Sequence, residues 1–307
     1  LDVDSFYVAA ELLRRPDLKG RCVAVSQYNS GGFVALSIEA KLAGLRKGDG
    51  VGDGGRRNIQ HLIDNNHISM EEAHAKCKDV PGGPLEVLAM DTDYYLGVSW
   101  QIYHRLVKQL AMFSGGTVQK ASYDDFYLDI SSAVEHGLST VGDLSLRGYI
   151  PKAAGVNMES LSKSDLVASD IAGKIKDDLA SFGLQVTFGV GPNKLIARMA
   201  SALAKPSLRG DAEGLALVPP RSAAAFVRYQ PIASVCGLGA KLGTKVSEVL
   251  RVFGGTLGDI AAAPKEDIMK VLQSVPNDIV QRLFAASIGD CSSKVVASGA
   301  PKTTLAE

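Results

Sequence analysis

Two acidic stretches, far apart in the sequence, constrain this chain more than any other feature. Residues 2–7 read DVDSFY, and residues 122–129 read SYDDFYLD. Each stretch lies in an apolar, β-branched or aromatic setting that is typical of a buried strand or a strand turn. Carboxylates rarely enter such strands unless a cation meets them there. We therefore expect the two strands to lie side by side, with Asp2, Asp124 and Asp125 converging on a divalent metal.

A cage of hard oxygen ligands suits Mg²⁺. A pair of such ions is the usual apparatus for in-line phosphoryl or nucleotidyl transfer. The alternative is structural, because aspartates at strand ends also cap helices and close turns, and a single D-x-D is a weak signal. Two paired stretches favour the metal, but the residues alone leave both interpretations open.

Composition narrows the class of protein. A chain of 307 residues should hold two or three domains, and 46% apolar residues indicate a globular protein. No apolar run approaches the length that spans a bilayer, and we expect no signal peptide. Lys plus Arg and Asp plus Glu both number 33. The resulting balance neither supports nor excludes nucleic-acid binding, because local patches decide that.

The cysteines and the chain ends carry weaker information. Four cysteines without a C-x-x-C spacing indicate reduced thiols in a cytosolic or nuclear protein, not a zinc site or a disulfide framework. The chain lacks an initiator Met, and a strand carrying Asp2 would normally have apolar residues before it. We therefore expect a fragment trimmed on its N-terminal side, with a linker-like stretch at 297–307.

The order of predicted elements favours an α+β chain. Strands and helices alternate up to about residue 219, which suits a two-layer α/β domain, and the chain is nearly all helix and turn from residue 220. A helix is predicted to begin after an N-cap at Ser69. Residues 48–66 are predicted to be a surface insertion and 141–169 an irregular connection. Predicted strands are 22–28, 33–37, 85–88 and 185–188; predicted helices are 8–13, 38–45, 94–112, 170–182 and 195–204.

A glycine-rich stretch, VCGLGAKLG at 235–243, stands out in the helical part. Glycines spaced around an apolar residue and followed by Lys and a helix are similar to a helix-hairpin-helix motif. Its amides and helix N-terminus can hold a DNA phosphate without reading sequence. An ordinary turn between helices explains this motif equally well.

Taken in order, these motifs resemble those of the Y-family (translesion) DNA polymerases, and among them the polymerase eta branch. Residues 2–7 resemble D-M-D-x-F-[FY], with Glu11 at the matching later position, and 121–129 resemble A-S-I-D-E-x-Y-x-D. Residues 35–41, ALSIEAK, resemble A-V-S-Y-E-A-R, and 25–29 resemble V-V-Q-Y-x. Residues 189–206 and 234–243 are similar to further ordered segments of the family. Several motifs in the same order are far more specific than any one alone.

The resemblance implies a palm at 1–10 and 80–219, built on a two-layer α/β sheet. It implies fingers at 11–79 with an insertion at about 48–68. An all-helical thumb at 220–290 would carry the helix-hairpin-helix-like motif. Residues 291–307 would be a linker towards a little-finger domain that has no counterpart here, so DNA binding should be weak and salt-sensitive.

The resemblance also implies template-directed nucleotidyl transfer with two Mg²⁺ ions, for which Mn²⁺ can substitute. Expected partners are primer–template DNA, deoxynucleoside triphosphates and a sliding clamp reached through missing C-terminal regions. The expected location is the nucleus. The implied metal ligands are Asp2, the Val3 carbonyl, Asp124 and Asp125. The implied nucleotide-binding residues are Ser5, Phe6, Tyr7 as steric gate against a 2′-hydroxyl, Lys41, Lys47 and Lys205; Gln27 would contact the template base, and Ser122, Gly237, Gly239 and Lys241 the primer or DNA backbone.

Several positions depart from the family pattern. Asp125 stands where the family has Glu, and Ile38 stands where it has a tyrosine whose hydroxyl binds phosphate. Lys41 and Lys47 replace arginines, which keeps the charge and loses the bidentate geometry. A shift of about 1 Å at a catalytic centre can cost about a hundredfold in rate. A second hypothesis is therefore a catalytically impaired DNA-binding or scaffolding relative of the same fold.

A third hypothesis is another enzyme with a palm fold. The sequence Tyr123-Asp124-Asp125 is similar to the Y-x-D-D of reverse transcriptases, and a palm also serves nucleotidyl cyclases. The helix-hairpin-helix-like motif and Gln27 argue against cyclases, which need neither. On the sequence, a translesion DNA polymerase is the leading hypothesis.

Overall fold

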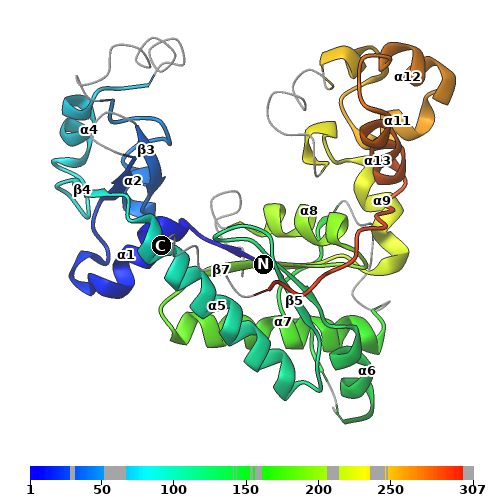
Figure 1. Cartoon of the computed structure of the whole chain (residues 1–307), viewed down its shortest axis with the longest axis horizontal. Helices are drawn as coiled ribbons and strands as arrows, with labels where there is room; N and C mark the ends of the chain where they lie inside the picture. Colours follow the sequence, from blue (N-terminus) through cyan, green and yellow to red (C-terminus); the bar gives the residue numbers. More distant parts are fainter. Residues whose placement is uncertain are drawn as a thin grey trace, which may run out of the picture.

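The structure, a computed structural model, has two arms that rise from a common base (Figure 1). Small sheets and many helices make it a mixed α+β fold, as predicted. We describe residues 1–27, 32–51, 67–140, 142, 144–152, 155, 161–205, 214–235, 246 and 248–299. Within these ranges, no helix is both long and apolar enough to cross a bilayer.

The base is built on a three-stranded sheet with the order β1-β7-β8. Strand β1 (Asp2–Val3) runs antiparallel to β7 (Val186–Val190), and β8 (Leu215–Leu217) runs parallel to β7. Asp2 lies opposite Thr187. Val3 is buried, while Asp2 remains partly exposed, so the strand alternates as a half-buried strand should.

The second acidic stretch joins this sheet through a hairpin of β5 (Thr117–Lys120) and β6 (Phe126–Asp129). An isolated bridge pairs Asp2 with Asp125. The Val3 amide donates to the Asp124 carbonyl at 3.0 Å, and the Phe126 amide donates to the Leu1 carbonyl at 3.0 Å. The prediction that the two acidic stretches lie side by side is therefore confirmed.

Both acidic strands are shorter than predicted. Ser5 has a left-handed backbone with φ 49°, which ends the extended chain, and helix α1 (Phe6–Arg14) begins at the next residue rather than at residue 8. In the second stretch, residues 122–124 form a turn before β6. A side chain can lie in a turn and still face the neighbouring strand, so the carboxylates meet despite the shorter strands.

Helices cover both faces of the central sheet (Figure 1). Helices α5 (Thr92–Met112) and α7 (Lys163–Ser181) lie below it, α6 (Ser131–Thr140) packs against α7, and α8 (Lys194–Ala204) lies above. The predicted irregular connection at 141–169 was wrong from residue 163 onward. Helix α7 begins at Lys163 because Ser162 and Asp165 form a capping box.

One arm carries a sheet with the order β3-β2-β4. Its strands are β2 (Val23–Ser26), β3 (Phe33–Leu36) and β4 (Glu86–Ala89), and its helices are α2 (Ile38–Leu42), α4 (Met70–Cys77) and the short 3₁₀ turn η1 (Pro16–Leu18). The predicted N-cap is confirmed, since Ser69 forms a capping box with Glu72.

The predicted surface insertion was wrong at its start. Asp49 is 1% exposed, and its carboxylate accepts the Arg46 amide at 2.8 Å and contacts His67 Nδ1 at 3.1 Å. This part of the segment therefore packs into the arm. Residues 52–66 of the insertion lie outside the described residues.

The other arm is helical, as predicted from residue 220 onward. Residues 289–299 then leave it and return along β5. There the Ser298 hydroxyl oxygen accepts the Lys120 amide at 2.7 Å. The described helices are α9 (Ala223–Arg228), α11 (Leu257–Ala262), α12 (Lys265–Val271) and α13 (Asn277–Ser287), with 3₁₀ turns η6 (Pro220–Ser222), η7 (Ile232–Ser234) and η8 (Leu250–Phe253).

The buried apolar residues form three clusters. The first fills the base between the central sheet, α1, α5 and α7. The second joins α8 to the helical arm, and the third lies inside the other arm and contains Cys22 and Cys77. Cys22, Cys77 and Cys291 are free thiols, as predicted, and Cys236 lies outside the described residues. The acidic residues sit in the base, where both arms begin.

Candidate active site

Two of the three carboxylates predicted to bind metal have side-chain partners. Asp2 Oδ1 accepts from Lys205 Nζ at 2.7 Å, and the lysine comes from the C-terminal end of α8. Asp124 Oδ1 accepts from the Ser122 hydroxyl at 2.6 Å. Both carboxylates are partly exposed, so a ligand from solvent can reach them.

Ser122 organises the turn that carries two of the carboxylates. Its oxygen accepts the amides of Asp124 at 3.3 Å and Asp125 at 3.0 Å while its hydroxyl proton goes to the Asp124 carboxylate. Serine is well suited to such a turn because one hydroxyl can donate and accept at the same time. Ser122 thereby fixes the backbone from which both aspartates project.

Electrostatic repulsion is concentrated on Asp125. Burial, followed by the negative charges of Asp2 and Asp124, raises the pKa of its carboxyl, and Arg198 opposes that rise. Beside it lies a cavity of about 190 Å³ whose lining includes Asp2, Asp125, Arg198 and Lys205. A cation entering this region would relieve the repulsion among the three carboxylates.

The carboxylate oxygens of this region fit a hard divalent cation, although the side chains do not form a ready site. Within the described ranges, no three His, Cys, Asp or Glu side chains form a ready metal cluster. The backbones of Asp2, Asp124 and Asp125 nevertheless converge, and their oxygens are the ligands that Mg²⁺ prefers. Metal binding would require Asp2 to give up its ion pair with Lys205, and Asp124 to give up its hydrogen bond from Ser122.

Asp4 belongs to this region, although we did not predict a role for it. Its two carboxylate oxygens accept from Thr187 Oγ1 at 3.2 and 3.0 Å. Burial is the main cause that raises the pKa of Asp4, against the bond from Thr187. The D-x-D spacing is the signal that could have identified it, because alternate positions of a strand share one face.

The start of α1 is a second polar centre next to the carboxylates. Lys41 Nζ donates to Ser5 Oγ at 2.7 Å, which links the β3-β2-β4 arm to the base. Ser5 makes no side-chain cap on α1, so the first-turn amides are left for another acceptor. Phe6 is buried, whereas the Tyr7 ring is partly exposed.

Charges and aromatic rings near this centre influence one another. Partial burial lowers the pKa of Lys41, helped by Lys47 and Lys205 and opposed by Asp4. For Lys205, burial disfavours the charge, but the bond and attraction to Asp2 outweigh it and raise the pKa. Burial, followed by the charge of Asp124, raises the pKa of Tyr7. These couplings place Lys41, Lys205 and Tyr7 around the same acidic centre.

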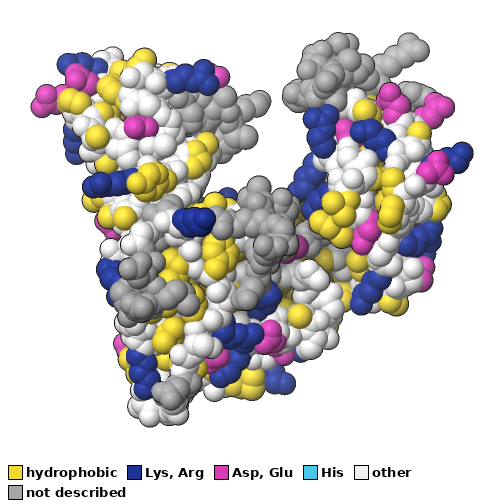
Figure 2. Space-filling view, turned by 180° about the vertical axis from the view of Figure 1, so that it is seen from behind, with side chains coloured by type: hydrophobic (Ala, Val, Ile, Leu, Met, Phe, Trp, Pro, Cys, Tyr) yellow, Lys and Arg dark blue, Asp and Glu magenta, His cyan; other side chains and the backbone are white. Residues whose placement is uncertain are grey.

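The remaining predicted residues are more dispersed. Gln27 follows β2 and Lys47 lies in a turn after α2, and both are exposed. Gly237, Gly239 and Lys241 lie outside the described residues. On the face that Figure 2 shows, Lys and Arg side chains are spread over both arms and the base.

A comparison with models of protein families shows which family this chain belongs to. The model of the impB/mucB/samB family matches residues 1–202, which contain both acidic stretches. The chain belongs to this family. The predicted resemblance to the Y-family polymerases is thereby confirmed, because this is the family of those enzymes.

Relatives in the impB/mucB/samB family include DNA polymerase iota of Mus musculus, which is 25% identical over 99% of this chain and 38% of that protein. DNA polymerase eta of Arabidopsis thaliana is 25% identical over 85% of this chain and 38% of that protein. The chain thus spans well under half the length of these two relatives.

A solved structure described as an insertion ternary complex of Dbh DNA polymerase has the same fold. Its TM-score is 0.65 at 20% identity, and the match covers 96% of this chain and 67% of the other. This likeness confirms the predicted Y-family fold.

Proposed function

We propose that this chain is the core of a template-directed DNA polymerase of the translesion type. The observation that supports the proposal best is the meeting of Asp2 with Asp124 and Asp125 across joined strands. Membership of the impB/mucB/samB family and the polymerase names of the relatives agree with it. The partners that follow are primer–template DNA and deoxynucleoside triphosphates.

The three parts of the fold take the domain names of a polymerase in this proposal. The palm is 1–10 and 80–219, which includes the base. The fingers are 11–79, which include β2 and β3 of the arm with the β3-β2-β4 sheet. Strand β4 completes the sheet of that arm by pairing with β2, although it lies in the range given to the palm. The helical arm, 220–290, is the thumb, and 291–307 is a linker. Figure 2 shows a wide notch between the two arms, and in this proposal the duplex would lie there.

Asp2, Asp124, Asp125 and the Val3 carbonyl would hold two divalent ions, Mg²⁺ or Mn²⁺. The chemistry supplied by ions held there would be a lower pKa of the primer 3′-hydroxyl and neutralisation of the charge on the leaving pyrophosphate. Ser122 keeps the Asp124–Asp125 turn in place on the primer side. Lys205 would leave Asp2 and contact the triphosphate.

The triphosphate would lie over the start of α1. The uncapped amides near Ser5 and Phe6 and the positive end of the helix favour an anion. Lys41 and Lys205 would add charge-assisted hydrogen bonds. Lys47 would lie over the incoming base and Gln27 against the template base.

The sugar of the incoming nucleotide would stack on Tyr7, whose ring blocks a 2′-hydroxyl. Gly237, Gly239 and Lys241 of the thumb would hold the DNA backbone. A sliding clamp and a nuclear location remain predictions from the family resemblance.

One observation favours a second candidate, a DNA-binding relative with impaired catalysis. Asp125 is a methylene shorter than the family's Glu, and Asp2 and Asp124 are already partnered by Lys205 and Ser122. A site that must break these contacts can turn over slowly or not at all.

Primer extension separates the two candidates. The protein is incubated with Mg²⁺, deoxynucleotides and either an undamaged or a dimer-containing template. Extension is expected on both templates, and Asp124→Asn should abolish it. The matched control is Asp129→Asn, an exposed aspartate on the same hairpin that bonds to Ser131, which should leave extension intact. Normal extension by Asp124→Asn would show that the metal assignment is wrong, whereas DNA binding without extension by the unaltered protein would favour the second candidate.

A further inference from the structure

Ser99 is a buried side chain whose hydrogen bond leaves its own helix. It lies about two turns into α5 and is fully buried. Its hydroxyl donates to the Tyr123 carbonyl at 2.6 Å, in the turn before β6. A serine inside a helix commonly bonds to a carbonyl of the preceding turn instead, as the buried Ser169 does with Leu166 at 2.9 Å. Ser99 therefore links α5 to the turn that carries the acidic residues.

The bond from Ser99 fixes the peptide group that precedes Asp124. Because a trans peptide is planar, the Tyr123 carbonyl and the Asp124 amide point in opposite directions. With the carbonyl held by Ser99, the amide faces Ser122 Oγ, which accepts it at 3.3 Å. That contact is long for a hydrogen bond, so Ser122 by itself holds this amide loosely. The short bond from Ser99 is the stronger constraint on this peptide group.

The peptide group that follows Asp124 is fixed by β1. Its carbonyl oxygen accepts the Val3 amide at 3.0 Å, on the strand that also carries Asp2. A residue has only two soft backbone dihedrals, so fixing both flanking peptide groups fixes the backbone of Asp124. The direction in which the Asp124 carboxylate leaves the chain, relative to Asp2, therefore depends on Ser99 and β1 together.

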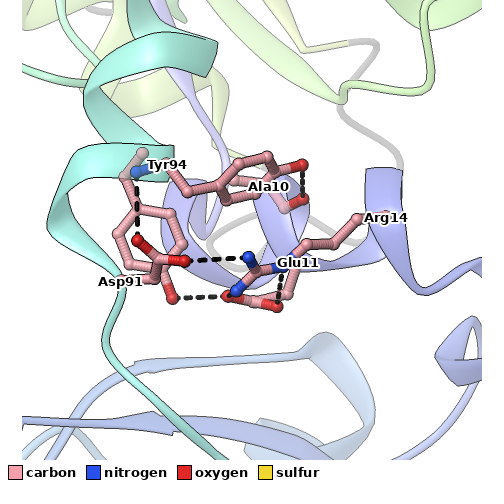
Figure 3. Close-up of polar contacts among 6 residues, drawn as sticks. Ala10, Glu11, Arg14, Asp91 and Tyr94 are labelled. Atoms are coloured by element: carbon pink, nitrogen blue, oxygen red, sulfur yellow. Dashed lines mark hydrogen bonds and ion pairs between the residues drawn. The ribbon is translucent and has the colours of Figure 1, made fainter.

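Helix α5 is a firm support for Ser99 because its first turn is tied to α1. Asp91 Oδ1 caps α5 by accepting the Tyr94 amide at 3.1 Å, and Asp91 Oδ2 accepts from Arg14 Nη1 at 2.9 Å. The Tyr94 hydroxyl donates to the Ala10 carbonyl at 3.0 Å. Figure 3 shows these residues between α1 and α5. Ser99 thus projects from a helix whose start is fixed against its neighbour.

We propose that Ser99 is a positioning residue that directs the Asp124 carboxylate towards the divalent ion and so raises the affinity of the site. The inference rests on the proposed polymerase function and its metal ligands. Without the hydroxyl, the peptide group before Asp124 is free to rotate, and the Tyr123 carbonyl loses its donor. Metal binding would then have to order the turn as well, which weakens the apparent affinity.

Two fully buried serines allow a matched comparison. Ser99→Ala removes the hydroxyl that reaches the acidic turn, whereas Ser169→Ala removes one that bonds within α7 and accepts the Arg147 amide at 3.2 Å. Thermal unfolding is followed over a Mg²⁺ titration, without DNA or nucleotide. For the same rise in Tm, Ser99→Ala should need about tenfold more Mg²⁺ than the unaltered protein, and Ser169→Ala no more. Asp124→Asn gives the rise that Mg²⁺ causes elsewhere on the protein.

A third variant separates the hydrogen bond from the volume of the side chain. Ser99→Cys fills the space that alanine leaves empty, but its thiol is a weak donor. It should need nearly as much Mg²⁺ as Ser99→Ala. Primer extension gives a second readout, in which both variants need more Mg²⁺ and excess Mg²⁺ restores most of the rate. If Ser99→Cys matches the unaltered protein while Ser99→Ala does not, the cavity explains the effect and the inference is wrong.

The other outcomes are distinct. An equal Mg²⁺ requirement in Ser99→Ala and the unaltered protein would overturn the inference and leave the polymerase proposal intact. Equal increases in Ser99→Ala and Ser169→Ala would show that Ser99 has only a structural role, which also overturns it. If the unaltered protein gains no more from Mg²⁺ than Asp124→Asn does, the metal assignment itself is wrong, and the inference with it.

Discussion

Lys205, at the end of α8, is ion-paired with Asp2 on β1, and 2.7 Å separate Nζ from Oδ1. The pair joins two of the residues on which the proposed chemistry depends. Because the Lys205 side chain is 38% exposed, solvent screens the pair, and its contribution to stability should be small. In the proposed mechanism the pair matters for function, because Lys205 would have to leave Asp2 before a metal ion binds there.

Replacing Lys205 should therefore affect nucleotide binding more than stability. Lys205→Ala is expected to raise the KM for deoxynucleotides about tenfold, because a charge-assisted bond to the triphosphate is lost. Steady-state primer extension measures this effect. The control is Lys174→Ala, which removes a lysine from an ion pair of the same 2.7 Å length with Asp170 on α7. A KM that rises equally in both variants would contradict the role given to Lys205.

Ser122→Ala should lower kcat about tenfold with little change in the KM for nucleotide. The alanine leaves the amides of Asp124 and Asp125 without their acceptor, so the turn that carries both carboxylates loses its fixed geometry. Single-turnover extension measures the chemical step. Ser131→Ala is the matched control, since its hydroxyl donates to Asp129 Oδ1 at 2.7 Å beyond the other end of β6. An unaltered rate in Ser122→Ala would show that the turn keeps its shape without the serine.

Asp125→Asn should stabilise the metal-free protein at neutral pH. The folded-state pKa of Asp125 is raised, chiefly by burial and then by Asp2 and Asp124, so ionising it in the native state costs stability. That cost is absent below the ordinary aspartate pKa, grows as pH rises, and is complete above the raised pKa. The gain from Asn should therefore vanish on acidification. Thermal unfolding across pH, with a chelator present, measures it.

The same assay tests the metal site without measuring activity. Mg²⁺ at a hundredfold excess over its dissociation constant should stabilise a protein that binds it only when folded by about 2.7 kcal/mol. The unaltered protein should show such a rise in Tm on adding Mg²⁺, and Asp125→Asn a smaller one. If Mg²⁺ raises the Tm of both proteins equally, Asp125 is not a ligand.

Gly189→Ala should destabilise the base by about 2–4 kcal/mol. Gly189 lies on β7 directly under α8, and an added Cβ would collide with the Ala197 carbonyl and the Ser201 amide, which are rigid helix backbone. Gly97→Ala is the contrasting control. Gly97 is exposed in α5 with open space around it, so alanine should stabilise by about 1 kcal/mol. Urea unfolding of both variants checks the opposite signs.

Local sequence was a good guide wherever local chemistry decides structure. The capping box at Ser69 and Glu72 was predictable because both partners lie within one turn. The apolar spacing of residues 94–112 predicted α5 to within two residues, since the stripe facing the core repeats every turn. The start of α1 was misjudged because Ser5 adopts a left-handed backbone that no pattern of apolar residues announces.

Identity and spacing of the acidic residues were thus enough to indicate that two remote acidic stretches lie side by side. The amino-acid order alone could not show that Asp2 is ion-paired with Lys205, or that the Tyr95 hydroxyl donates to the Glu11 carboxylate. Those contacts join residues that are 84 to about 200 positions apart. Hydrophobic periodicity reports which face of an element turns inward, but only the packing of the sheet against α5 and α8 determines which side chain it meets there.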